Sequence, residues 1–366
     1  MFVPVRLARV AAATLMIAAA SSAAAQWGGG HSRWRNILDN PPNFYGSGES
    51  IRVAENVLLY QNDNGGWPKN IDMARQLSDN DKARLRETHN RSETIIDNGG
   101  TWSQIRFLAL MHEATGDARF ADAAEHGIEY LLEAQYPSGG WPMIFPLRKG
   151  YYSHITFNDG AMMGVMNLLR DVSLKKKPLD FVDSSLRERS QQAIDRGLDV
   201  ILRTQVIVDG RPTAWCAQYD ETTLQPAPAR TYELVSLSGC ESVGIVDYLI
   251  GIDNPSPEVK RAIESAVDWF EKVKIEGQAI KWERDPDTHR PTDRTVVADP
   301  SAGPLWARFY EIGTNRPMFV GRDGIIHDQL ADVEQERRLG YTWLGDWPIK
   351  LLSEEYPNWR KKWVGP

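Results

Sequence analysis

The chain has 366 residues, a formal net charge of −7 and 42% hydrophobic residues. An acidic chain of this kind is a poor candidate for nucleic-acid binding, because that affinity depends on many lysines and arginines that neutralise phosphates. Its two cysteines, Cys216 and Cys240, could form one disulfide but are too few for a disulfide-stapled fold. The length suits one large domain or two ordinary ones held together by a hydrophobic core.

The first 25 residues are typical of a cleavable export signal. Arg6 and Arg9 precede a short apolar run, and three alanines before Gln26 provide a cleavage site. The apolar run is shorter than the ~20 residues of a membrane span, which argues against a membrane anchor. We therefore predict a signal peptide at 1–25, a single catalytic domain at 26–366, and a secreted or periplasmic protein that does not bind membranes.

A short phrase recurs along the first two thirds of the chain. The pattern Gln-x3-Gly-Gly-Trp-Pro starts at Gln61 and again at Gln135, and a weaker copy runs from Gln205 to Trp215. Each glutamine ends an apolar helical stretch, and a fixed period of helix plus Gly-rich turn indicates a repeated supersecondary unit. Lys69 is the only lysine of the phrase, so we expect the departures from the repeat to mark the functional site.

Helical periodicity dominates the chain after residue 50. Stretches that are apolar nearly all round begin near residues 105, 159 and 239, and amphipathic stretches begin near residues 120, 186 and 259. A helix that is apolar all round belongs in the interior, whereas an amphipathic helix covers it. We therefore predict an all-α fold, an α/α toroid of inner helices wrapped by outer ones, with few short strands. From Lys281 onward, frequent prolines predict long irregular loops.

Two of the predicted inner helices are each preceded by an aspartate beside an asparagine. Asp97-Asn98 precedes the first of them, and Asn158-Asp159 precedes the second. Helix capping is the ordinary use of such residues, but one cap needs one side chain, and both pairs are expected at the same rim of the toroid. Carboxylate and amide oxygens also suit Ca²⁺, which takes about six to eight oxygen ligands. The pattern alone allows both capping and a metal site at Asp97 and Asp159.

Arginines gather among aromatic residues and glycines in the second half of the chain. They are Arg230, Arg308, Arg322, Arg337 and Arg338. Each of them alone suits an ordinary structural salt bridge. As a group beside Trp, Tyr and Gly, they favour forked binding of carboxylates.

In their order along the chain, these motifs resemble polysaccharide lyase family 10, a family of pectate lyases. The resembling segments are Gly65–Lys69, Ile96–Gly99, Gln135–Pro142, Phe157–Gly160, Ala229–Glu233, Trp306–Tyr310, Asn315–Pro317, Gly321–Gly324 and Glu336–Tyr341. One segment alone would be weak, but their shared order across most of the chain makes the resemblance specific. It implies an (α/α)3 toroid that cleaves polygalacturonate with the help of Ca²⁺.

The resemblance also implies roles for individual residues. Arg230 matches the base that removes the C5 proton of galacturonate in a β-elimination. Asp97 and Asp159 match the calcium-binding region, with Asn98 beside them in contact with substrate. The matching cations that hold galacturonate carboxylates are Lys69, Arg308, Arg322 and Arg337. Tyr341 is the aromatic residue that we expect to contact a sugar ring.

These residues suit a β-elimination. Removing the C5 proton places negative charge on the neighbouring carboxylate, which a Ca²⁺ ion and arginines stabilise. An arginine base is unusual, because the guanidinium group is normally always protonated. We expect burial and nearby cations to lower the pKa of Arg230.

Three other functions are compatible with parts of the pattern. A glycoside hydrolase would use Asp97 and Asp159 as its two carboxyl groups. Terpenoid cyclases on a related toroid have a similar Gln-x3-Gly-x-Trp repeat, but the Asp-rich acid motifs of those enzymes are missing from this sequence. A non-catalytic pectin-binding protein would bind oligogalacturonate without turnover. In each pectin-related case we expect a monomer whose partner is a polygalacturonate chain.

Overall fold

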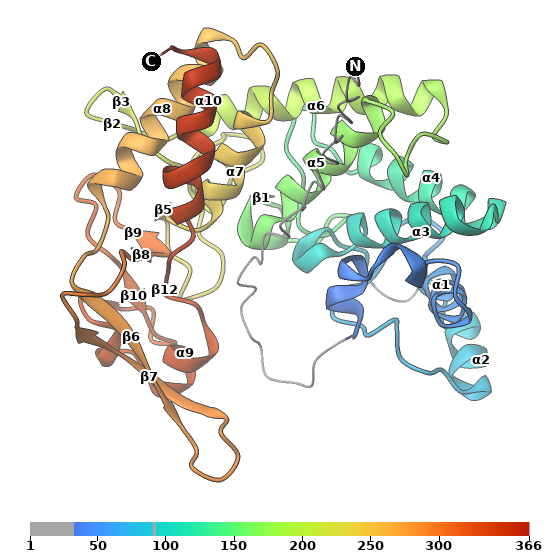
Figure 1. Cartoon of the computed structure of the whole chain (residues 1–366), viewed down its shortest axis with the longest axis horizontal. Coiled ribbons are helices and arrows are strands. Elements are labelled where there is room, and N and C mark those ends of the chain that lie inside the picture. The colour runs from blue at the N-terminus through green and yellow to red at the C-terminus, as the bar shows by residue number, and fades with distance from the viewer. Residues whose placement is uncertain (1–32, 91–92, 366) are drawn as a thin grey trace, which may run out of the picture.

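The computed structural model describes residues 33–90 and 93–365, so the signal peptide predicted at 1–25 lies outside the described residues. Three pairs of packed helices form the body of the protein (Figure 1). They are α3 (Trp102–Thr115) with α4 (Ala118–Glu133), α5 (Ala161–Ser173) with α6 (Ser184–Thr204), and α7 (Glu241–Ile250) with α8 (Pro257–Lys272). This architecture confirms the predicted all-α (α/α)3 toroid. Within the described ranges, no helix is both long and apolar enough to cross a bilayer.

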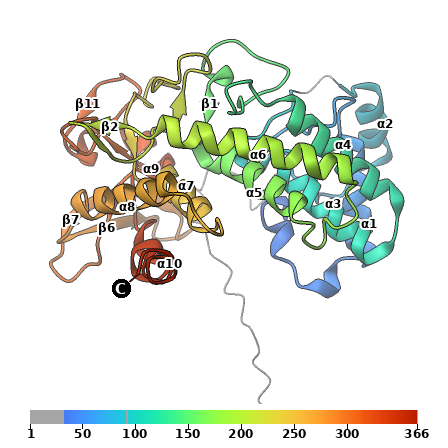
Figure 2. The same cartoon turned by 90° about the horizontal axis from the view of Figure 1, so that it is seen from above.

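The helices form an inner and an outer layer. The inner helices α3, α5 and α7 contact one another in sequence, and the outer helices α4, α6 and α8 do the same. Helix α1 (Gly48–Tyr60) packs on α3 and α4, and α6 lies along α5 (Figure 2). The inner helices are buried on most faces because their apolar residues are not confined to one stripe. The predicted assignment of apolar stretches to the interior is therefore confirmed.

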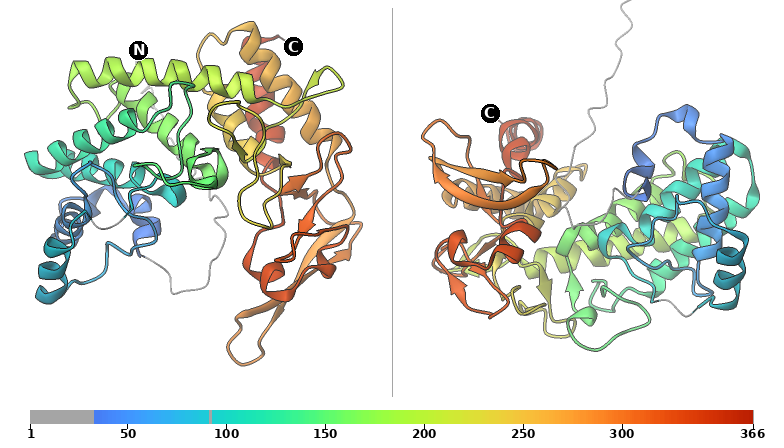
Figure 3. Two further views of the ribbon diagram at one scale, coloured as in Figure 1. Left: turned by 180° about the vertical axis from the view of Figure 1, so that it is seen from behind. Right: turned by 90° about the horizontal axis from the view of Figure 1, so that it is seen from below.

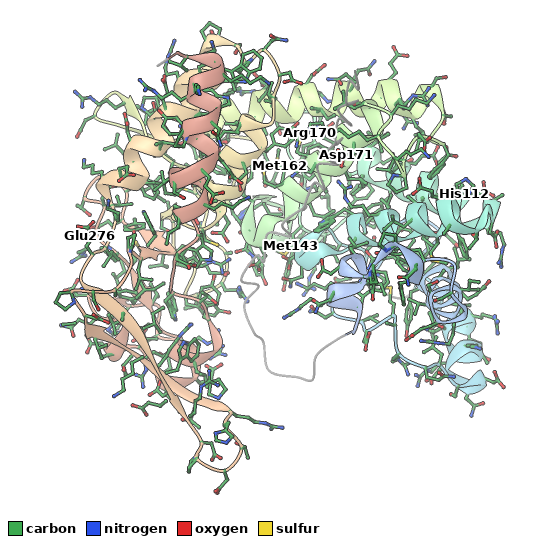
Figure 4. The ribbon with its side chains drawn as sticks, in the orientation of Figure 1. His112, Met143, Met162, Arg170, Asp171 and Glu276 are labelled. Carbon is green, nitrogen blue, oxygen red and sulfur yellow. The ribbon has the colours of Figure 1, made fainter. Side chains whose placement is uncertain are left out.

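Polar contacts on α5 connect the three inner helices. Arg170 and Asp171, labelled in Figure 4, lie next to each other near the end of α5. Arg170 Nη1 donates to the carbonyl of Tyr248 on α7 at 3.1 Å. Asp171 Oδ2 accepts from Arg106 Nη2 on α3 at 2.7 Å. Two adjacent side chains thus fix α5 between its neighbours.

The repeated glutamine joins the helix that it ends, α1, α4 or α6, to the next outer helix. In every copy, the side-chain amide donates one hydrogen bond to the following turn and one to the next outer helix. The acceptor carbonyls are Gly65 and Ala123 for Gln61, Gly139 and Ala193 for Gln135, and Thr213 and Ala262 for Gln205, all at 2.8–3.0 Å. The third copy, which is weak in sequence, is therefore equivalent to the other two in structure.

A buried tryptophan closes each of these turns, and the structure contains a fourth example. Each indole Nε1 donates at 2.7–2.8 Å to a carbonyl near the end of the preceding outer helix. The pairs are Trp67 with Val57, Trp141 with Leu131, Trp215 with Ile201, and Trp306 with Phe270. The fourth pair extends the repeat to α8, beyond the three copies recognised in the sequence.

The C-terminal part differs in one respect from the prediction of irregular loops. Strands β6 (Gln278–Arg284) and β7 (Pro291–Ala298) form an antiparallel hairpin that projects from the body (Figure 1 and Figure 3). Pro286 lies in its turn and Pro291 begins β7. The prolines that predicted loops therefore bound the hairpin without interrupting it, because proline is tolerated at the first position of a strand.

The remaining elements are short. The other strands form two-residue antiparallel pairs: β1 (Ile155–Thr156) with β4 (Gln218–Tyr219), β2 (Ile207–Val208) with β3 (Arg211–Pro212), β5 (Leu237–Ser238) with β9 (Phe309–Tyr310), β8 (Trp306–Ala307) with β12 (Leu344–Gly345), and β10 (Phe319–Val320) with β11 (Ile326–His327). The other α-helices are α2 (Asp79–Glu87), α9 (Gln335–Gly340) and α10 (Tyr356–Trp363), with a π-helical turn at Leu351–Glu355. Short 3₁₀ helices lie at Arg33–Asp39, Pro42–Phe44, Asp97–Gly99, Tyr151–Ser153, Asn158–Gly160 and Leu330–Asp332. Strands β1 to β5 lie in the segments that lead to α5 and α7, and β8 to β12 lie in the C-terminal segment after α8.

We predict that Gln61→Ala lowers the free energy of unfolding by about 1–3 kcal/mol, because two carbonyls lose their donor in a buried turn. Urea denaturation would measure the loss. Gln191→Ala is the matched control, since Gln191 is exposed on α6 and bonds only to Asp195 in the described hydrogen bonds. Equal losses for the two variants would show that the repeated glutamine does not hold the outer layer together.

Candidate active site

The repeat brings the entrances of the inner helices to one rim. In three copies, the carbonyl two residues after the buried tryptophan accepts a backbone N–H from the segment that leads into an inner helix. These bonds join Met143 to Ile96, Ala217 to Phe157, and Arg308 to Gly239, at 2.8–3.1 Å. The next two residues along the chain are therefore equivalent in the three copies: Asp97 and Asn98, Asn158 and Asp159, and Cys240 and Glu241.

The two aspartates predicted at this rim do not cap helices. The N-cap residue of α3 is Thr101 and that of α5 is Gly160, and neither helix receives a side-chain cap bond. Asn98 and Asp159 adopt left-handed backbone angles, with φ of 51° and 50°, which few non-glycine residues do. The capping interpretation is wrong, and the carboxylates of Asp97 and Asp159 are available for other contacts.

Asp97 pairs with the one lysine of the repeated phrase. Lys69 Nζ lies 2.6 Å from Asp97 Oδ2, and the side chains are 31% and 5% exposed. The other carboxylate oxygen, Oδ1, is buried and has no hydrogen-bond partner among the described residues. Burial raises the pKa of Asp97; the charge of Lys69 opposes this shift and that of nearby Asp159 adds to it. One buried oxygen of Asp97 therefore remains for a cation or a donor group.

Arg308 lies at the centre of a second group of charges. Its Nη2 donates to Asp159 Oδ1 at 2.7 Å and also to Glu241 Oε1. The side chains of Arg308 and Glu241 are only 4% and 1% exposed. Burial raises the pKa of Asp159, but Arg308 outweighs it, so this pKa lies below the ordinary value. Arg308 thus keeps Asp159 ionised beside Asp97.

Arg230 forms the third part of the site. Its Nε donates to Glu233 Oε2 at 2.7 Å, and its Nη2 donates to Glu233 Oε1. Tyr341 Oη donates to Glu233 Oε1 at 2.8 Å. Burial lowers the pKa of Arg230, but the bonds and charge of Glu233 raise it more, so the pKa lies above the ordinary arginine value. The expectation of a lowered pKa is wrong for this structure, because a carboxylate is the closest partner of Arg230.

Tyr341 connects these groups. Its ring lies below the guanidinium carbons of both Arg308 and Arg230, at 4.9 and 5.8 Å from the ring centroid. The positive charge of Arg230 also lowers the pKa of Asp159. The structure therefore brings together Lys69, Asp97, Asp159, Arg230, Arg308 and Tyr341.

The other predicted residues lie at the edge of this group. Asn98 is exposed beside Asp97. Arg337 is buried, with its guanidinium 4.9 Å above the ring of Tyr232. Arg322 is 61% exposed and shares Glu336 with Arg337. All three border the central cluster, and Arg322 is the one most open to solvent.

Arg338 has a structural role. It donates to Asp293 on β7 and to the carbonyls of Ala331 and Val333. The bond to Asp293 joins α9, which carries Arg337, to the projecting hairpin. The ordinary interpretation of this arginine as a structural salt bridge is therefore confirmed.

Sequence reasoning missed two buried carboxylates. Glu241 holds Arg308, and Glu233 holds Arg230. Glu241 occupies the repeat position of Asn98 and Asp159, so extending the repeat to the third inner helix would have found it. Glu233 has no comparable signal, because only a close turn brings it to Arg230.

The two cysteines are free thiols, so the disulfide that the sequence permits does not form. Cys240 lies at the repeat position of Asp97, next to Glu241. Burial raises the pKa of Cys216 to about 12, so this thiol stays protonated.

Comparisons with known proteins are consistent over most of the chain. Residues 61–352 match the profile of a family described as pectic acid lyase. A family 10 polysaccharide lyase from Cellvibrio cellulosa is 31% identical, with a TM-score of 0.74, over 92% of this chain and 97% of that chain. A mutant of such a lyase from the same organism, in complex with trigalacturonic acid, is 30% identical over 91% and 98% of the two chains, also with a TM-score of 0.74. A search of curated proteins found no match.

We predict that Arg308→Met lowers the free energy of unfolding by about 3–5 kcal/mol, because Glu241 is left as a buried charge without its partner. Adding Glu241→Gln to this variant should recover part of the loss. Arg316→Met is the control, since Arg316 pairs with Asp328 at the surface and should cost about 0–1 kcal/mol. Equal losses in urea denaturation for the two arginine variants would contradict a buried ion network at the rim.

Proposed function

The chain belongs to the pectic acid lyase family and is a polysaccharide lyase of family 10, and we propose that it cleaves α-1,4-linked polygalacturonate by calcium-assisted β-elimination. We propose Arg230 as the base. The observation that carries the proposal is the convergence of Arg230, Asp159 and Arg308 around one buried tyrosine. The related lyase in complex with trigalacturonic acid supports polygalacturonate as the substrate.

The cations of the site differ in how they would act on a galacturonate carboxylate. Lys69 is about a third exposed and Arg322 more than half, so both can reach a chain lying on the surface. Arg308 and Arg337 are buried, so they would act by their positive field and by holding neighbouring carboxylates. A low-dielectric setting strengthens such fields relative to water.

The residues at the rim suit a calcium ion. Asp97 and Asp159 lie close together, and Asp97 Oδ1 is a buried oxygen without a protein donor in the described chain. No group of three or more His, Cys, Asp or Glu side chains among the described residues is arranged to bind a metal. Asp97 and Asp159 would therefore hold the ion together with oxygens of the substrate and of water. When bound, Ca²⁺ would stabilise the negative charge that develops on the galacturonate carboxylate.

The proposed elimination removes the C5 proton and breaks the C4–O bond of the glycosidic link. A neutral Arg230 nitrogen takes the C5 proton, and the C5–H electrons form the C4–C5 double bond. The C4–O bond breaks, and the departing oxygen takes a proton from solvent. Arg230 then returns its proton to solvent. The products are an oligogalacturonide with an unsaturated sugar at its non-reducing end and a fragment with a new reducing end.

The membership in a lyase family favours elimination over the other functions that the sequence permits. A glycoside hydrolase using Asp97 and Asp159 would add water across the bond and form no double bond. A pectin-binding protein would form no product. We also propose that the enzyme is exported, because residues 1–25 have the pattern of a signal peptide.

We predict that incubation with polygalacturonate and Ca²⁺ at alkaline pH produces an increase in ultraviolet absorbance, because each cleavage creates a conjugated double bond. A chelator should abolish the increase, and added Ca²⁺ should restore it. New reducing ends without absorbance would indicate hydrolysis. Binding of oligogalacturonate with neither signal would indicate a non-catalytic protein.

We predict that Arg230→Ala lowers kcat by about 10²–10⁴-fold or more, the range of a lost general base. In the wild-type enzyme, the rate should rise with pH into the alkaline range. The reason is that the neutral, proton-accepting form of Arg230 increases as pH approaches its raised pKa. Arg203→Ala, on the exposed face of α6, is the control and should leave the profile unchanged. An optimum in acid would contradict an arginine base.

A further inference from the structure

A tight turn places Glu233 against Arg230. The backbone N–H of Glu233 donates to the carbonyl of Arg230 at 2.8 Å, and that of Ala229 donates to the carbonyl of Glu233 at 3.0 Å. The Glu233 carboxylate also accepts from the backbone N–H of Arg230 at 3.2 Å. Side chain and main chain of Glu233 thus hold the same arginine, so neither can shift without the other.

The pairing of the two side chains is bidentate. Glu233 Oε2 accepts from Nε of Arg230, and Oε1 accepts from Nη2. Two parallel bonds of this kind fix the plane of a guanidinium group as well as its position. The ring of Tyr232 lies 4.9 Å from the guanidinium carbon and limits it further. The orientation of Arg230 is therefore set by its own turn.

Given the proposed β-elimination, we propose that Glu233 is a positioning residue for Arg230, a carboxylate clamp that aims the guanidine and controls how readily it takes a proton from the substrate. This role deepens the function proposed above. It means that Glu233 affects both the maximal kcat and the pH at which kcat rises.

The burial of the pair shows which member faces the substrate. The side chain of Arg230 is 31% exposed and that of Glu233 is 8% exposed. Glu233 therefore lies behind Arg230. Tyr341, whose hydroxyl also donates a hydrogen bond to Glu233, is buried as well. A carboxylate in this position acts through the arginine and does not itself reach a sugar ring.

The clamp has opposing consequences for the reaction. A fixed guanidine favours the aligned geometry that proton transfer needs. A carboxylate partner also favours the protonated guanidinium, because an opposite charge nearby stabilises the charged form. Loss of the carboxylate should therefore lower the maximal rate and, at the same time, allow the base to work at lower pH.

Profiles of kcat against pH for the wild type, Glu233→Asp and Glu233→Gln would test the proposal. We expect the rising limb to move to lower pH by about 1–3 pH units in Glu233→Gln, with a lower maximum. Glu233→Asp keeps a charge that cannot reach both nitrogens, so its limb should lie between the other two. Glu271→Gln is the matched control, since Glu271 pairs with a lysine three residues away at the surface, and its limb should stay in place.

The outcomes separate this inference from the proposed function. The inference would be overturned if the wild type is active and kcat rises over the same pH range in both Glu233 variants as in the wild type. A residue with a purely structural role lowers kcat without changing the pH at which it rises. If Glu233→Gln does not fold, as judged by circular dichroism, the limb of Glu233→Asp decides. A wild type that forms no unsaturated product would overturn the proposed function and the clamp together.

Discussion

The indole hydrogen bond of a buried tryptophan is the constraint on which the rest of this protein depends. Four times, an indole N–H from Trp67, Trp141, Trp215 or Trp306 donates to a carbonyl in the last turn of the preceding helix, where backbone donors run out. The residue two positions further on then lies at the rim of the toroid. In the first and fourth copies that residue is a cation, Lys69 or Arg308, and in the middle two it is Met143 or Ala217. The tryptophan hydrogen bonds of the scaffold thus determine where Lys69 and Arg308 place their positive charges at the rim.

The charges at the rim are arranged as pairs of opposite sign. Asp97 lies with Lys69, Glu241 and Asp159 lie with Arg308, and Glu233 lies with Arg230. The buried carboxylates of Asp97, Glu233 and Glu241 would be costly without their cations, because isolated charges lose their hydration in the interior. The pairing therefore makes the site possible, and it also limits the arginine proposed as base, whose closest partner favours its protonated form.

Helical periodicity and the glutamine repeat were enough to predict the toroid, since both reflect contacts between neighbouring elements. Order along the chain was enough to select Lys69, Arg308, Asp97 and Asp159, which the structure brings together. The fourth copy was missed because the hairpin β6–β7 separates Phe270 from Trp306 by 36 positions, against 10 in the first two copies. The ionisation of Arg230 was predicted with the wrong sign because it depends on Glu233, a buried partner that no periodic pattern reveals.

The hydrogen bond between Arg308 and Asp159 spans 149 positions of the chain. Contacts this distant in sequence form late, after the cost of closing a long loop has been met. During synthesis, the first three copies of the repeat leave the ribosome well before Arg308 does, and domains assemble from the N-terminus as they emerge. The growing polypeptide therefore carries Asp159 and Glu241 as unmatched negative charges until its last quarter arrives. The charges at the rim are therefore balanced only after residue 308 has been synthesised.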